Sequence, residues 1–423
     1  MVSREALTGA GRTMTGPEGL TGRDGAGGYP HPMSDAAEGR APTAGPSAAE
    51  ESTEPDQAWR IGAIAGVPVY LAKSWLVIAA LVIYMFAPQV RTVRPADPAI
   101  SAYLVAAAYA VVLLITVLIH EVAHAVVAVR ARYQVRHIVV HLLGGHTIYD
   151  STNNRPGASA LVAVSGPAAN FALAGICHLA APAVPWEIGE LLLNAATLAN
   201  VFVGGFNLLP GLPLDGGHLV ESLVWGATRN RNTGRIVAGW FGRVVTLVVL
   251  YWFLIRPALA GEPLGLFSIV WVGMIALFLW RGAGAAIRGG QVRGRLESVQ
   301  LSTLLRPIRL ARHTDSVAAI APWLGEATVV VIGADQHPLG IVDPAALAEI
   351  PRSDWESASA DAVAVRLPDP WVVQADPAGD VVPVAIALER SGAAAVVVIG
   401  PDGEPAGCVY ARDVVALTQG TRA

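Results

Sequence analysis

Residues 101–124 of this chain are SAYLVAAAYAVVLLITVLIHEVAH, and they decide how it folds. The first 19 of them, Ser101 to Ile119, carry no charge, which is the length and composition of a membrane-spanning helix. In the next five residues His120 and His124 lie four positions apart, so both side chains project from one face of that helix. A single Zn²⁺ can bind such a pair, and the stretch therefore predicts a metal site inside a bilayer.

Glu121 lies beside the first histidine, where its carboxylate can take a proton from a water molecule at the metal. A catalytic zinc needs three protein ligands and one open position, so a third ligand must come from elsewhere. Soluble zinc enzymes with the same pair of histidines often have a third histidine six residues after the second, but that position is Arg130 here. The best candidate is Asp215, at the end of the turn-forming segment NLLPGLPLDGG (207–217), which should break a helix and bring its backbone near the metal.

The composition fits a membrane protein better than a soluble one. Of the 423 residues, 53% are hydrophobic and 15% are charged. The net charge of −4 implies no large basic surface, so we expect no nucleic acid partner. The two cysteines, Cys177 and Cys408, match no disulfide or thiolate–zinc spacing.

Six hydrophobic stretches are long enough to cross a membrane: 74–90, 101–128, 157–181, 191–213, 236–255 and 263–280. Eleven arginines lie in the loops after the second and fourth stretches and just after the sixth, against three in the opposite loops. By the positive-inside rule, both termini are cytoplasmic in a multi-pass protein of the bacterial inner (cell) membrane. The second and fourth spans then both run inward, which brings the histidine pair and Asp215 to the same side.

The remaining segments predict three regions. Residues 1–57 are rich in Gly, Pro, Ala and Ser, which indicates a disordered tail. Residues 58–290 should form the transmembrane domain, with either a strand pair or a re-entrant loop at 135–150. Residues 297–423 alternate apolar strands with helical stretches, and ATVVVIGADQHPLGIVD (327–343) matches AAVVVIGPDGEPAGCVY (394–410). This match indicates two copies of one unit, at about 297–360 and 361–423.

Taken together, these motifs resemble the site-2 protease family of intramembrane zinc metalloproteases. The resemblance covers roughly residues 60–423 and rests on the six spans and on four motifs: His120-Glu121-x-x-His124, Gly144-Gly145, SGPAAN (165–170) and NLLPGLPLDGG (207–217). The duplicated C-terminal unit resembles a pair of CBS domains, as in the branch that processes bacterial sporulation factors. The expected fold is therefore a polytopic α-helical membrane protein with a small membrane-associated β element, followed by a cytosolic α/β tandem CBS module.

The resemblance implies hydrolysis of peptide bonds within or next to transmembrane segments of regulatory membrane proteins. It implies one Zn²⁺ per chain, held by the two histidines and Asp215, with Glu121 as general base. Gly144, Gly145 and Asn207 would bind an unwound substrate as an extended strand, because a helical peptide bond is shielded by its own hydrogen bonds. Asn170 would either hold the substrate backbone or bridge two helices. His141 and His146 are the alternative metal ligands.

For the C-terminal pair, the resemblance suggests homodimerisation or regulation by an adenine nucleotide. The segment GCVYARD (407–413) keeps the ribose-binding Asp413 but has Tyr410 where a small hydroxyl residue is usual, so we expect dimerisation and weak nucleotide binding. Rival functions are a catalytically silent scaffold, a nucleotide-sensing regulator and a transporter, which should show matching broken helices in two halves. Arg243, at the start of the fifth span, is expected to extend to the membrane interface.

Overall fold

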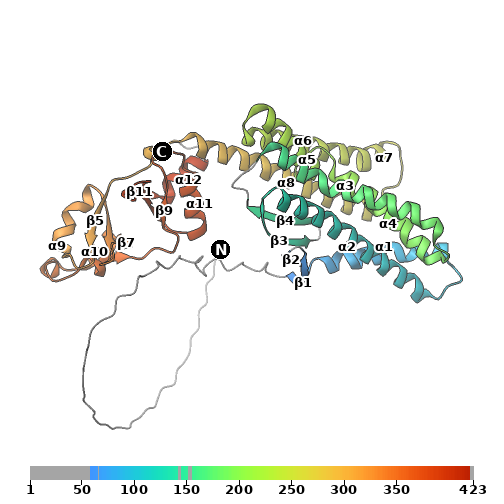
Figure 1. Cartoon of the computed structure of the whole chain (residues 1–423), viewed down its shortest axis with the longest axis horizontal. Coiled ribbons are helices and arrows are strands. Elements are labelled where there is room, and N and C mark those ends of the chain that lie inside the picture. Colours follow the sequence, from blue (N-terminus) through green and yellow to red (C-terminus); the bar gives the residue numbers. More distant parts are fainter. Residues whose placement is uncertain (1–57, 65, 142–143, 151–154, 420–423) are drawn as a thin grey trace, which may run out of the picture. The chain divides into compact units, whose positions relative to one another are not determined.

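The computed structural model describes residues 58–64, 66–141, 144–150 and 155–419, and of residues 144–150 only the backbone (Figure 1). The predicted tail at 1–57 lies outside the described residues. Within them, six helical segments are long and apolar enough to cross a membrane. They are α1 (Trp75–Val93), α2 (Ala99–Arg130), α3 (Pro156–Ala180) with η1 (Ala181–Ala183), α4 (Glu187–Asn207), α6 (Arg231–Leu250) continued by η2 (Tyr251–Ile255) and α7 (Arg256–Leu259), and α8 (Leu266–Ser298).

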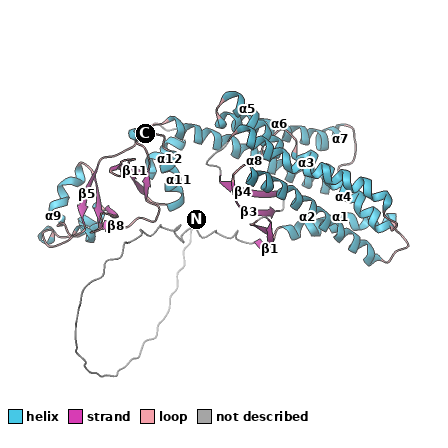
Figure 2. Ribbon diagram, in the orientation of Figure 1, coloured by secondary structure: helices cyan, strands magenta, loops and turns pink. Residues whose placement is uncertain are grey.

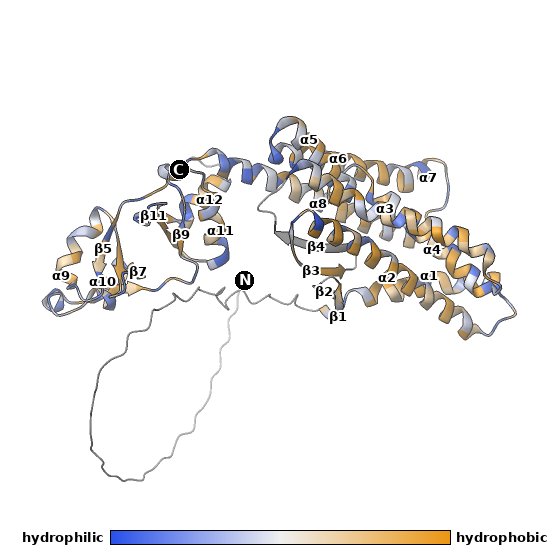
Figure 3. Cartoon of the chain, in the orientation of Figure 1, coloured by the Kyte–Doolittle hydropathy of each residue, from blue (hydrophilic) through white to orange (hydrophobic). Residues whose placement is uncertain are grey.

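The outer faces of these helices are apolar, as lipid requires. Leu76, Leu179 and Leu198 are 58%, 80% and 70% exposed, and hydrophobic residues predominate along α1 and α2 in Figure 3. The buried side is instead rich in small residues such as Ala106, Ala110 and Ala128. Small residues let helix backbones approach closely where no hydrophobic effect drives the helices together. The six segments therefore form a bundle with lipid as its solvent.

Two helix ends differ most from the predicted span ends. The fourth span was predicted to run to residue 213, but α4 ends at Asn207 and a new helix, α5 (Asp215–Thr228), begins after the turn. Pro210 and Pro213 explain the break, because proline supplies no backbone N–H. The sixth span was predicted to end at residue 280, but α8 continues to Ser298, since a helix need not stop where the apolar stretch does.

Two strands before α1 and two strands after α2 form a small sheet. It consists of β1 (Ala58–Ile64), β2 (Val67–Ala72), β3 (Gln134–His141) and β4 (Gly144–Asp150), in that order across the sheet (Figure 2). The β2 and β3 strands are parallel, while β3 and β4 form an antiparallel pair in which Val140 lies opposite Gly145. The strand-pair alternative for residues 135–150 is thus the one that the structure shows. Among the described strands, β4 is an edge strand of this sheet.

The C-terminal part contains two sheets of matching topology. In the first, β5 (Ile308–Arg312) runs parallel to β6 (Thr328–Ile332), which pairs with the antiparallel β7 (Pro338–Val342) and then β8 (Ala364–Val365). In the second, β9 (Val372–Gln374) runs parallel to β10 (Ala395–Ile399), which pairs with the antiparallel β11 (Pro405–Tyr410). Short helices accompany them: α9 (Val317–Ile320), α10 (Pro344–Glu349), α11 (Val382–Ser391) and α12 (Ala411–Gln419). The shared order confirms the predicted duplication.

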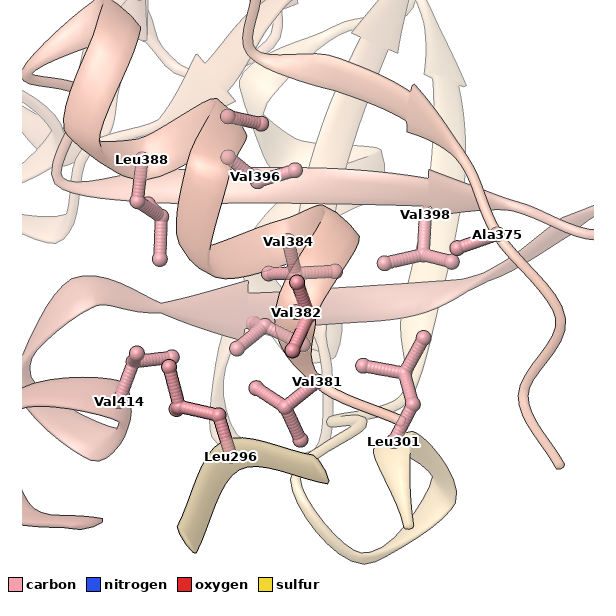
Figure 4. Close-up of a cluster of buried hydrophobic side chains, with 12 residues drawn as sticks. Leu296, Leu301, Ala375, Val381, Val382, Val384, Leu388, Val396, Val398 and Val414 are labelled. Carbon is pink, nitrogen blue, oxygen red and sulfur yellow. The ribbon is translucent and has the colours of Figure 1, made fainter. Parts of the chain in front are cut away.

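The core of the second unit includes the end of α8. Figure 4 shows Leu296 beside Val381 and Val414, within a cluster that also holds Val384 and Val396. The last turn of α8 therefore packs with the C-terminal unit. The predicted fold class is confirmed: six membrane-type helices and a small sheet, then an α/β module of two like units. The predicted boundaries at residues 290 and 297 stay predictions.

Candidate metal centre

Three of the predicted site residues converge between α2 and α5. Nε2 of His120 lies 2.9 Å from Oδ2 of Asp215, and Nε2 of His124 lies 3.2 Å from the same oxygen. The two Nε2 atoms are 3.0 Å apart, and the three possible ligand atoms lie within 4.8 Å of one another. Both histidines are buried. Two imidazole nitrogens and one carboxylate oxygen, gathered around one point, fit the donor set of a catalytic zinc site.

The outer nitrogen of each histidine is held by an oxygen. Nδ1 of His120 lies 2.5 Å from Oδ1 of Asn170, and Nδ1 of His124 lies 2.7 Å from the carbonyl oxygen of Val162. A carbonyl oxygen can only accept, so each Nδ1 carries the proton and donates it. Each Nε2 then keeps its lone pair and faces the third ligand, which is the tautomer that metal binding requires.

Asn170 is itself fixed by a polar chain through the bundle. Its Nδ2 donates to Oδ1 of Asn200 at 2.8 Å, and Nδ2 of Asn200 donates to Oγ1 of Thr116 at 3.0 Å. Both asparagines are fully buried. This geometry favours the helix-bridging alternative for Asn170. Sequence reasoning missed Asn200 and Thr116, although a buried carboxamide in an apolar span is a signal of function.

Replacing Asn170 with Ala should weaken zinc binding. The change leaves the His120 N–H without its acceptor and frees the ring to rotate, and losing such a contact typically costs about 10–100-fold in metal affinity. A competing chelator, titrated against the purified protein, measures this affinity. The matched control is Asn207→Ala, since Nδ2 of Asn207 donates to the Val203 carbonyl of its own helix. Equal zinc affinity in the two variants would contradict an orienting role for Asn170.

Close backbone packing positions the ligands. A Cβ atom on Gly166 of α3 would overlap the His124 ring and lie 2.7 Å from Nε2 of His120, so only glycine fits there. The turn before Asp215 is held by α6, because the N–H of Leu212 donates to the Ala238 carbonyl of that helix at 3.1 Å. A Cβ atom on Gly282 of α8 would meet Pro213 of the same turn at 2.6 Å. Helices α3, α6 and α8 thus fix the approach of Asp215 to α2.

An ion pair anchors α5 beyond Asp215. Oε1 of the buried Glu221 accepts from Nε of Arg231 at 3.0 Å, and its other oxygen lies 3.4 Å from Nδ1 of His218. Burial acts to raise the pKa of the Glu221 carboxyl, but His218 and Arg231 outweigh it and hold that pKa below its usual range. Glu221 therefore stays ionised and ties α5 to the start of α6.

The other predicted residues lie in different settings. Glu121 is buried in α2 beside His120, with 5% of its surface exposed. Gly144 and Gly145 begin the edge strand β4, and Asn207 ends α4 before the turn. The side chains of His141 and His146 lie outside the described residues. In the C-terminal module, Asp413 accepts from Nη2 of Arg306 at 3.0 Å.

Comparisons with known proteins agree with this geometry. The family model described as "Peptidase family M50" matches residues 108–190 and 181–251. The chain is 27% identical to the protein sll0528 of Synechocystis sp., which bears the name of a zinc metalloprotease, over 85% of this chain and 95% of that one. It is 34% identical to Rip3 of Mycobacterium tuberculosis, similarly named, over 62% of this chain and 65% of that one.

Two solved structures cover different parts of the chain. The "Site-2 Protease from Methanocaldococcus jannaschii" is 20% identical with a TM-score of 0.40, over 54% of this chain and 95% of that one. The CBS domain of a bacterial CNNM/CorC family Mg²⁺ transporter, in complex with ATP, is 16% identical with a TM-score of 0.25, over 31% of this chain and 95% of that one. From the family match, the curated relatives and the six apolar helices, the chain is a multi-pass membrane zinc metalloprotease of the site-2 type, similar over residues 108–251 to peptidase family M50.

Proposed function

We propose that this protease cuts peptide bonds within or next to transmembrane segments of regulatory membrane proteins, with His120, His124 and Asp215 as zinc ligands and Glu121 as general base. The observation that carries the proposal is the His–His–Asp group buried among helices whose outer faces suit lipid. A site in that place meets substrates that lie in the membrane themselves.

The residues of the chain would divide the chemistry as follows. Bound zinc would polarise the scissile carbonyl and make water easier to deprotonate. The carboxylate of Glu121 would take the proton from the attacking water and pass it to the leaving amine. Asn170 and the Val162 carbonyl would keep both histidines in the ligating tautomer.

Substrate recognition is assigned to the edge strand β4. A helical substrate hides its peptide bonds in its own hydrogen bonds, so it must unwind before attack. An unwound segment can add to an open sheet edge, where backbone groups supply the affinity. Gly144 and Gly145 carry no side chain that would hold a substrate backbone away from that edge, and Asn207 is proposed to contact the same segment. This supports a substrate that is extended at the cut.

A substrate trap tests the proposed substrate class. Cells carrying a Glu121→Gln form should retain uncut substrates, so proteins that co-purify with this form and not with the native enzyme are the candidates. We expect integral membrane proteins with a regulatory domain on one side of the membrane. Enrichment of soluble proteins alone would contradict the proposal, because such substrates need no site in a bilayer.

For the C-terminal module we propose a role in dimerisation, with both termini in the cytoplasm. Oγ1 of Thr328 lies 2.9 Å from the hydroxyl of Tyr410, and Asp413 is paired with Arg306. The Tyr410 hydroxyl and the Asp413 carboxylate, which stand where a nucleotide would bind, are thus already engaged by other side chains. This favours a role in assembly over a role as a nucleotide sensor. The intact His–His–Asp group argues against a silent scaffold.

We therefore expect no measurable binding of ATP or AMP to the full-length protein at a nucleotide concentration of about 1 μM. A sensor whose binding free energy is about −8 kcal/mol would be half occupied at that concentration. Calorimetry measures this directly. The matched variant is Tyr410→Thr, which restores the small hydroxyl residue and should increase the affinity. Sub-micromolar binding to the unchanged protein would make the ligand-sensor function the better one.

A further inference from the structure

Arg243 of α6 has an unusual setting for an arginine in a membrane helix. Its guanidinium carbon lies 4.6 Å from the ring centre of Trp240 and 4.9 Å from that of Trp280 on α8. Its Nε atom is buried and has no hydrogen-bond partner among the residues that the structure describes. None of the acidic side chains in the described ranges forms an ion pair with it. A positive charge is thus held between two aromatic faces with hydrogen-bonding capacity left over.

The guanidinium of Arg288 lies close to that of Arg243, beside Gly284. A Cβ atom on Gly284 of α8 would lie 3.2 Å from Nη1 of Arg288 and 4.0 Å from Nη2 of Arg243. Arg288 also lacks an acidic partner within the described residues, and glycine leaves room between the two groups. Two like charges so close together repel each other unless an anion lies between them. The arginine pair on α6 and α8 therefore has the charge and the donors of an anion site.

The position of this arginine pair along the helices indicates which anion would bind. The segment Val244–Ile255 that follows Arg243 carries no charge, and neither does Leu266–Trp280, which ends beside Arg281. Both uncharged runs stop at the arginine–tryptophan cluster, so the cluster lies at one boundary of the apolar layer. Tryptophan is enriched at that boundary, and the anions found there are lipid phosphates.

We propose that the arginine–tryptophan cluster on α6 and α8 binds the headgroup phosphate of an anionic phospholipid from the arginine-rich side of the membrane. Arg243 and Arg288 donate to the phosphate oxygens, because the planar guanidinium matches phosphate with two parallel hydrogen bonds. Trp240 and Trp280, which are 53% and 43% exposed, flank the upper part of the acyl chains. A cluster of basic side chains between transmembrane helices is a known form of lipid headgroup site.

The test compares lipids that stay bound to the full-length protein. The native protein is extracted from nanodiscs of equal phosphatidylglycerol and phosphatidylcholine, and retained lipid is counted by native mass spectrometry. We expect phosphatidylglycerol to be retained preferentially, and Arg243→Gln and Arg288→Gln each to lower its retention about fivefold. The matched control is Arg293→Gln, which removes the same charge from α8, but from a guanidinium already paired with Glu297.

A competition with phosphate and a comparison of melting temperatures test the proposal further. Inorganic phosphate at millimolar concentration should not displace the lipid; if it does, the arginine pair binds a soluble anion instead. The unchanged protein should melt at a higher temperature in nanodiscs with phosphatidylglycerol than in phosphatidylcholine alone, a comparison that does not depend on any variant folding. Equal retention of both lipids by the native protein, or equal losses in Arg288→Gln and Arg293→Gln, would overturn the proposal.

Discussion

Replacing Glu121 with Gln should abolish cleavage of a membrane substrate while zinc stays bound. The carboxamide has nearly the shape of the carboxylate but cannot accept the proton of the attacking water, and loss of a general base typically costs about 10²–10⁴-fold in rate. His120, His124 and Asp215 are untouched, so the metal content should equal that of the native enzyme. Cleavage assays and elemental analysis of the same preparation measure the two properties together.

The matched control for this change is Glu190→Gln. Glu190 lies in the first turn of α4 and is exposed, so the same chemical change there should leave activity unaltered. If the Glu121 variant cuts substrate at nearly the native rate, another residue is the base. If it loses zinc as well as activity, Glu121 acts on metal binding and not on the proton.

Replacing Asp215 with Ala should lower both zinc occupancy and activity. The change removes the single carboxylate oxygen that lies within hydrogen-bonding distance of both Nε2 atoms, and leaves two protein ligands. We expect zinc affinity to fall about 10²-fold or more, because each ligand contributes directly to the binding free energy. Zinc-to-protein ratios after dialysis against a weak chelator provide the measurement.

Asp97→Ala is the control for that experiment, since Asp97 pairs with Arg94 in the loop between α1 and α2. Its zinc content should match that of the native protein. Full zinc stoichiometry in the Asp215 variant would instead assign the third ligand elsewhere, with His146 and His141 as the next candidates.

Local patterns in the sequence were enough to predict the helices and the metal group. Nineteen uncharged residues followed by a histidine pair fix both the span and the face on which the two histidines lie. The arginine distribution placed Asp215 on the same side as that pair, and the two meet in the structure. The repeated apolar strands likewise predicted two like C-terminal units, which the matching sheets confirm.

Contacts between distant segments could not be predicted in this way. The link from Thr116 through Asn200 and Asn170 to His120 joins three helices, and nothing near each residue in the sequence specifies its partner. Helix ends were also misplaced, because hydropathy reports the apolar layer and not the hydrogen bonds that continue α8 to Ser298. The hydrogen bond that holds the turn before Asp215 against α6 joins Leu212 to Ala238, two residues that come together only in the folded bundle.

The most direct test of the central claim is the position of the cut. The purified enzyme is reconstituted with a trapped membrane substrate, and the products are mapped by mass spectrometry with and without a zinc chelator. We expect a single region of cleavage inside or next to the transmembrane segment, absent with chelator and absent in the Glu121→Gln form. Cleavage confined to a soluble domain, or cleavage that persists without zinc, would contradict it.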